Sequence, residues 1–113
     1  MHQFDLKNRT AIITGGAQGF GLDIAKRFIK SGANVIIWDI DQKELEKASK
    51  EIDSSSLSYN VVDVSDFNKV NEIVNQIIKK SKIDILINNA GITGSTASLW
   101  DYDVDEWNKI VQI

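Results

Sequence analysis

The sequence of 113 residues predicts an α/β protein built on a parallel sheet, because two kinds of segment alternate along it. Short continuous runs rich in β-branched residues recur, and such runs are typical of strands buried on both faces. Segments with helical spacing of apolar residues lie between them. Consecutive β-α-β units join parallel strands through right-handed crossovers, with helices on both faces of the sheet.

Four runs are predicted to be strands. The first ends directly before a cluster of glycines, and the second ends at an aspartate. The third carries a tyrosine, and the fourth is followed by two asparagines. In order, these predicted strands are Thr10–Thr14, Val35–Trp38, Leu57–Val62 and Ile83–Ile87.

Three amphipathic helices are predicted between the strands. The second begins with a plausible capping box, in which Asp41 precedes Glu44 by three positions. A fourth helix is expected from about Val104, with Asp103 as its cap. The apolar faces of the first three helices are Leu22, Ala25, Phe28 and Ile29, then Leu45, Ala48 and Ile52, then Val70, Ile73, Val74, Ile77 and Ile78.

Composition narrows the class of protein. The length suits one domain, residues 1–113, and the net charge of −3 gives no indication of a nucleic-acid or membrane-surface partner. The absence of cysteine excludes disulfides, thiolate metal ligands and a thiol nucleophile, and no metal site is expected. No apolar run approaches the roughly 18 residues of a membrane span. A cytoplasmic location is therefore expected.

The stretch TGGAQGFG, residues 14–21, lies between the first predicted strand and the first helix. Glycine at Gly15 allows a sharp exit from the strand. Without Cβ atoms, Gly19 and Gly21 would let a pyrophosphate and a neighbouring strand approach the helix. The helix N-terminus offers unpaired N–H groups and partial positive charge, which suit a phosphate. A glycine-rich turn with packing duties only is the alternative.

The ligand of this loop is predicted to be a dinucleotide. The nucleoside-triphosphate motif is excluded because Leu22 stands where it needs lysine. Asp39, at the end of the second strand, can accept hydrogen bonds from the adenosine ribose hydroxyls. Its charge would oppose a 2′-phosphate about 5 Å away by on the order of 3 kcal/mol at an effective dielectric of 20. NAD is therefore preferred over NADP, unless Asp39 merely caps the next helix.

Several motifs together resemble the short-chain dehydrogenase/reductase family. TGGAQGFG matches the family's TGxxxGxG loop, and NNAG, residues 88–91, follows the fourth strand. Asp63 and Val64 follow the third strand, and VDEWNKIVQI resembles the opening of the family's long helix beside the active site. The resemblance covers essentially the whole chain. It implies a Rossmann-type doubly wound sheet with strand order 3-2-1-4.

The resemblance also implies a site for a nicotinamide dinucleotide. Asp63 can accept from the adenine amino group, although a turn or cap role is the alternative. Asn88 is expected to hold neighbouring strands together through its amide rather than to contact the cofactor. The candidate cofactor-binding residues are Gly15, Gln18, Gly19, Phe20, Gly21, Asp39, Asp63, Val64, Asn89, Ala90 and Gly91.

The resemblance implies hydride transfer between nicotinamide and an alcohol or carbonyl. In the family the acid/base is a tyrosine whose pKa is lowered by a lysine four residues later, and a serine and an asparagine assist it. Here Tyr59 is followed at that distance by Asp63, and Tyr102 by Glu106, so both tyrosines are interpreted as packing residues. No catalytic residue is identified in the chain, and the serine, tyrosine and lysine are expected beyond Ile113. The chain is accordingly interpreted as the amino-terminal, cofactor-binding part of a homo-oligomeric enzyme.

Three functions remain open from the sequence. The first is an NAD(H)-dependent oxidoreductase acting on a small alcohol or carbonyl substrate. The second is a module that binds NAD without chemistry. The third is an S-adenosylmethionine-dependent methyltransferase, which also places an acidic residue after the second strand, although TGGAQGFG together with NNAG argues against it.

Overall fold

The structure, a computed structural model, describes residues 5–89, and in them four parallel strands form one sheet in the order β3-β2-β1-β4. This is the predicted order. The predicted helix from Val104 and the candidate site residues Ala90 and Gly91 lie outside the described residues. The elements are β1 (Thr10–Thr14), α1 (Gly19–Lys30), β2 (Asn34–Asp39), α2 (Gln42–Ile52), β3 (Leu57–Val61), α3 (Phe67–Ile78) and β4 (Ile85–Asn88).

The strands agree with their predicted ranges to within one residue at each end, except at the start of β4. Ile83 lies in an isolated bridge, and the strand begins two residues later than predicted. Between them, Asp84 joins the beginning of β1: its N–H donates to the Thr10 carbonyl, and its carboxylate accepts from the Thr10 N–H, each at 2.9 Å. A side-chain oxygen thus takes a place that a backbone carbonyl would fill in a regular ladder.

Burial on both faces holds for β1, where every residue is buried. It was wrong for β3 and β4, whose residues are only partly buried or exposed. These two strands lie at the edges of the described sheet, where each has one neighbouring strand.

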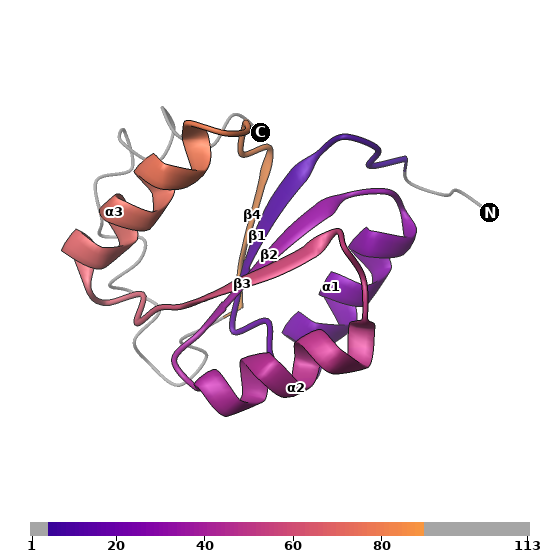
Figure 1. The fold of residues 1–113 in the computed structure, drawn as a ribbon, viewed down its shortest axis with the longest axis horizontal. Coiled ribbons are helices and arrows are strands. Elements are labelled where there is room, and N and C mark those ends of the chain that lie inside the picture. The colour runs from indigo at the N-terminus through magenta and orange to yellow at the C-terminus, as the bar shows by residue number, and fades with distance from the viewer. Residues whose placement is uncertain (1–4, 90–113) are drawn as a thin grey trace.

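The helices cover both faces of the sheet, as the doubly wound prediction requires. Figure 1 shows α1 and α2 together on one side and α3 on the other. Alternate strand residues pack against them: Ile13 and Ile37 lie in the cluster under α1 and α2, whereas Ile12 and Trp38 lie in the cluster with α3. Burying each of these larger side chains contributes about 1.5–3 kcal/mol.

Side-chain caps begin two of the three helices within residues 5–89. Asp41 accepts from the Glu44 N–H at 3.2 Å at the start of α2, so the predicted cap is confirmed. Asp66 accepts from the Lys69 N–H at 3.1 Å at the start of α3. α1 has no side-chain cap, although its N-cap residue Gln18 carries a side-chain amide. The uncapped end of α1 is its N-terminus, which directly follows the glycine loop.

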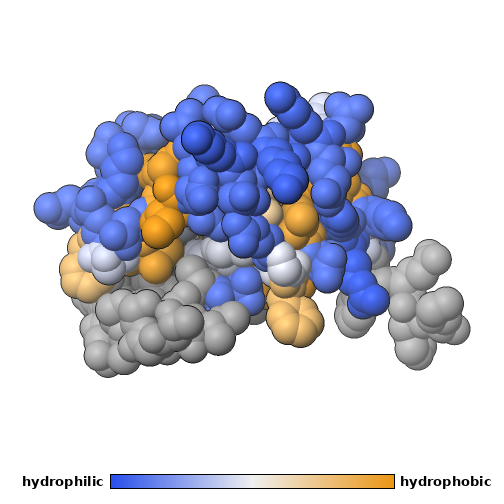
Figure 2. Space-filling model, turned by 90° about the horizontal axis from the view of Figure 1, so that it is seen from below, coloured by the Kyte–Doolittle hydropathy of each residue, from blue (hydrophilic) through white to orange (hydrophobic). Residues whose placement is uncertain are grey.

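The outer surface is mainly hydrophilic on the side drawn in Figure 2, where hydrophobic residues form small separate patches. Within residues 5–89, no helix has the length and apolar character needed to cross a membrane.

Candidate dinucleotide-binding site

The parallel register brings the predicted site residues to one edge of the sheet. Thr14, the last residue of β1, pairs with Trp38 of β2 and with Asn88 of β4. Asp39 at the end of β2 pairs with Val61 at the end of β3. The glycine loop, Asp39, Asp63 and Asn89 therefore all follow or end strands at the carboxyl edge. Ligands of open α/β sheets bind in this position.

The glycine loop depends on its missing side chains in two ways. Gly15 and Gly19 have φ values of 63° and 56°, in the left-handed region that favours glycine. A Cβ on Gly21 would lie 2.2 Å from the Gly15 carbonyl oxygen and 2.9 Å from the Asn89 Nδ2. A Cβ on Gly19 would meet nothing within 4 Å. Gly21 therefore permits close packing, whereas Gly19 borders open space.

The first turn of α1 is arranged to receive an anion. Gln18, Gly19 and Phe20 are exposed, and Phe20 has 76% of its surface accessible. No side chain caps this helix, and its first turn contains no acidic residue. Its N–H groups and the positive end of its dipole consequently face the side where a ligand can approach.

Two asparagines join β4 to the glycine loop through Thr14. The Thr14 hydroxyl donates to Asn88 Oδ1 at 3.1 Å and accepts from the Asn89 N–H at 2.9 Å. The Asn88 amide therefore does link neighbouring strands, as predicted, while its Nδ2 is buried and has no partner among the described residues. The Asn89 Nδ2 donates to the Gly15 carbonyl at 3.3 Å. Through this hydrogen bond the Asn89 side chain stabilises the glycine loop at Gly15.

Asp39 is partly buried, and its Oδ1 accepts from the Asp41 N–H at 3.1 Å. Asp41, rather than Asp39, caps α2. Within the part of the chain that the structure describes, no residue donates to the other oxygen of Asp39. A carboxylate held in this way at the end of β2 can accept from a ribose hydroxyl.

Asp63 lies in a turn directly after β3 and is exposed. Its Oδ1 accepts from the Ser65 N–H at 2.9 Å and from the Ser65 hydroxyl at 2.6 Å. These hydrogen bonds lower the pKa of Asp63, the hydroxyl having the larger effect. Asp63 therefore does have the turn role considered as its alternative. Val64, partly buried, packs against the cluster of β1, β2 and α3 side chains, which gives that part of the edge an apolar lining.

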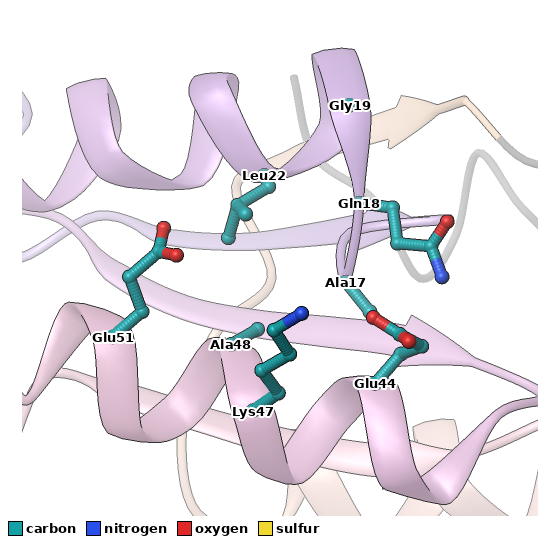
Figure 3. A pocket seen from close by; sticks show the side chains of 8 residues that line it. All are labelled: Ala17, Gln18, Gly19, Leu22, Glu44, Lys47, Ala48 and Glu51. Carbon is teal, nitrogen blue, oxygen red and sulfur yellow. The ribbon is translucent and has the colours of Figure 1, made fainter.

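A groove of about 340 Å³ lies between the glycine loop and α2. Figure 3 shows Lys47 and Glu44 extending from α2 toward the loop and α1, with Glu51 further along the helix. Glu51 also pairs with Lys26 of α1. The groove is lined by Ala17, Gln18, Gly19, Leu22, Glu44, Lys47, Ala48 and Glu51, so it holds two carboxylates against one ammonium group. Because Lys26 balances the charge of Glu51, the charges around the groove neither favour nor oppose a phosphate.

The sequence interpretation missed two residues of this edge. Thr14 was included in the loop motif without a role, although its hydroxyl joins both asparagines to β1. Ser65 was not considered, although an aspartate followed two residues later by serine, directly after a strand, is a turn signal. Within residues 5–89, no group of three or more His, Cys, Asp or Glu side chains could hold a metal ion.

A model of the short chain dehydrogenase family matches residues 9–113. The chain belongs to the short-chain dehydrogenase/reductase family, whose members are oxidoreductases with a nicotinamide-dinucleotide-binding fold. The match covers nearly the whole chain, and it counts against the methyltransferase alternative.

Relatives and solved structures of this family differ in substrate. The chain is 38% identical over 106 residues to 2-dehydro-3-deoxy-L-rhamnonate dehydrogenase (NAD(+)) from a Sphingomonas strain, covering 93% of this chain and 42% of that protein. It is similar to the 3-ketoacyl-(acyl-carrier-protein) reductase of Brucella melitensis complexed with NADH, with TM-score 0.65, 38% identity, and coverage of 72% of this chain and 33% of that one. L-sorbose reductase from Gluconobacter frateurii, complexed with NADPH and L-sorbose, gives TM-score 0.71, 29% identity and coverage of 80% and 36%.

The chain spans less than half the length of each of these three proteins. Those structures contain both forms of the cofactor, NADH in one and NADPH in the other. The family therefore defines a nicotinamide dinucleotide as the class of ligand.

Proposed function

We propose that the chain is the cofactor-binding part of an NAD(H)-dependent oxidoreductase that interconverts a small alcohol and its carbonyl compound. The observation that carries this proposal is the uncapped first turn of α1 behind an open Gly19, at the same edge of the sheet as the carboxylates of Asp39, at the end of β2, and Asp63, in the turn after β3. The arrangement offers an anion site and two acceptors of hydrogen bonds along one edge, as a dinucleotide requires.

Each part of the cofactor has a place in this proposal. The first turn of α1, with Gly19 and Phe20, would hold the diphosphate. Asp39 would accept from the adenosine ribose, and Asp63 and Val64 would hold the adenine ring. The nicotinamide ring supplies the chemistry, which is to accept or donate a hydride. Asn89 would act through the loop that it braces rather than through its side-chain amide.

The preference for NAD over NADP rests on charge. Asp39 ends β2, and Asp41 follows two residues later, so a 2′-phosphate would approach two carboxylates. TGGAQGFG contains no lysine or arginine to offset them.

A module that binds NAD without hydride transfer is the second candidate. We also propose a cytoplasmic location and a homo-oligomeric assembly for the enzyme, on the family resemblance and the composition.

Calorimetric titration of the purified protein with NAD⁺, NADP⁺ and S-adenosylmethionine tests the proposal. We expect NAD⁺ to bind most tightly and S-adenosylmethionine not to bind. Adding candidate alcohols and following the absorbance of NADH would then separate the enzyme from the binding module. Binding of S-adenosylmethionine in preference to both dinucleotides would contradict the proposed function.

A further inference from the structure

Asp63 is held more firmly than the other carboxylate of the site. The Ser65 hydroxyl and the Ser65 backbone N–H both donate to Asp63 Oδ1, at 2.6 and 2.9 Å. The Asp66 N–H donates to the Asp63 carbonyl at 2.9 Å and closes the turn. Asp39, by contrast, receives one hydrogen bond of this kind, from the Asp41 N–H at 3.1 Å. Asp41 has no hydroxyl group to add a second.

The two donors leave the other carboxylate oxygen of Asp63 available. No residue of the described segment, 5–89, donates to Asp63 Oδ2. The side chain is not needed as a helix cap, because Asp66 caps α3. The hydrogen bonds from Ser65 also lower the pKa of Asp63, so the carboxylate is ionised at neutral pH and can only accept hydrogen bonds.

A fixed acceptor discriminates between purine bases. The exocyclic amino group of adenine donates hydrogen bonds, whereas hypoxanthine and guanine carry an oxygen at the same ring position. That oxygen would face the Asp63 carboxylate, and two acceptors repel each other. The discrimination is sharpest when the carboxylate cannot rotate away, because rotation would let it avoid the mismatched base.

We propose that Ser65 is a positioning residue for adenine recognition, which fixes the Asp63 carboxylate so that Oδ2 accepts from the adenine amino group. The inference rests on the proposed function, since it requires a bound adenine dinucleotide. Ser65 does not touch the base itself. It acts by keeping Oδ1 of Asp63 occupied, which leaves Oδ2 to accept from the base.

The test compares NADH with reduced nicotinamide hypoxanthine dinucleotide, which differs only in the base. Both are followed by nicotinamide fluorescence on the full-length protein and on Ser65→Ala, Ser65→Thr and Asp63→Asn. Wild type should bind NADH about tenfold more tightly than the hypoxanthine analogue. Ser65→Ala should reduce that ratio several-fold, and Ser65→Thr should restore it because the hydroxyl is kept. Ser55→Ala, an exposed serine of another loop, is the matched control and should leave the ratio unchanged.

The outcomes separate the inference from the proposed function. If Asp63→Asn removes the preference for NADH but Ser65→Ala keeps it, Ser65 is not a positioning residue, while dinucleotide binding stands. If Ser65→Ala weakens both dinucleotides equally, its role is structural only and the inference fails. If wild type binds neither dinucleotide, the proposed function fails first.

Discussion

The side-chain amide of Asn89 donates to the carbonyl oxygen of Gly15 at 3.3 Å, across a separation of 74 residues in the sequence. The contact joins the end of β4 to the loop that follows β1. Gly21 makes it possible, because a Cβ at that position would lie 2.9 Å from the same amide nitrogen. The glycine motif and the asparagine motif are therefore two halves of one packing arrangement.

Replacing Asn89 by alanine should release the loop from β4. The loss of one part-buried hydrogen bond predicts a decrease of about 1 kcal/mol in the free energy of unfolding, together with weaker binding of NADH. Urea denaturation and fluorescence titration measure the two effects. Asn75→Ala, at an exposed position of α3, serves as the control. An Asn89→Ala variant with wild-type stability and affinity would show that the brace has no role.

Alanine at Gly21 and alanine at Gly19 should have different consequences. At Gly21 the new Cβ would lie 2.2 Å from a backbone oxygen, so the loop must shift, at a cost of about 1–3 kcal/mol or more. At Gly19 no atom lies within 4 Å, and the cost is that of a positive φ, about 1–2 kcal/mol.

Thermal unfolding should therefore show Gly21→Ala to be the less stable of these two variants. Gly19→Ala should instead weaken NADH binding by more than its change in stability explains, because the new methyl group would occupy the proposed diphosphate position. Equal stability of Gly21→Ala and wild type would contradict the close packing of α1 on the loop.

Removing the carboxylate of Asp84 should destabilise the sheet at the amino ends of β1 and β4, away from the candidate site. Asp84 is 6% exposed and accepts the Thr10 N–H, with the side chains of Arg9 and Lys82 at 3.6 and 3.8 Å. Asp84→Ala would leave that buried donor without a partner, at a cost of about 1–3 kcal/mol. Urea denaturation of this variant is the measurement, with the exposed Asp23→Ala as control. A loss no larger than that of the control would contradict the role given to Asp84.

The titration of Asp63 should depend on Ser65. The pKa of Asp63 is held below its ordinary value of 3.8, first by the Ser65 hydroxyl and then by the Ser65 N–H. Its contribution to stability is therefore present above that ordinary value and is lost as the pH falls through the lowered pKa. In Ser65→Ala the pKa should rise toward 3.8, which NMR of the side-chain carboxyl would detect. An unchanged titration would mean that the hydroxyl does not hold the carboxylate.

Much of the fold could be predicted because the hydrophobic pattern determines it. β1 has an apolar centre, Ala11–Ile13, and is fully buried, and the spacing of apolar residues identifies α1, α2 and α3. The strand order came from the family resemblance, and the structure confirms it. The start of β4 was wrong because Asp84 bonds through its side chain as well as its backbone. Apolar periodicity does not report such a contact.

The site was predictable by residue type but not by contact. Glycines after a strand and a carboxylate at the end of the next strand identify the edge. The contact of the Asn89 amide with Gly15 depends on the distance between two segments remote in sequence. The contact of Ser65 with one oxygen of Asp63 depends on the geometry of the turn. The pattern of residue types reports neither.

The most direct test of the central claim is the ratio of dissociation constants for NADPH and NADH, measured by nicotinamide fluorescence on the wild type and on Asp39→Asn. We predict that wild type binds NADH at least about tenfold more tightly than NADPH, because Asp39 repels the 2′-phosphate of NADPH. Solvent screens part of this repulsion, so the ratio is smaller than the unscreened repulsion would give. Asp39→Asn should narrow the ratio, mainly by improving NADPH binding. Equal affinities in the wild type, or a ratio that Asp39→Asn leaves unchanged, would contradict the proposed NAD site.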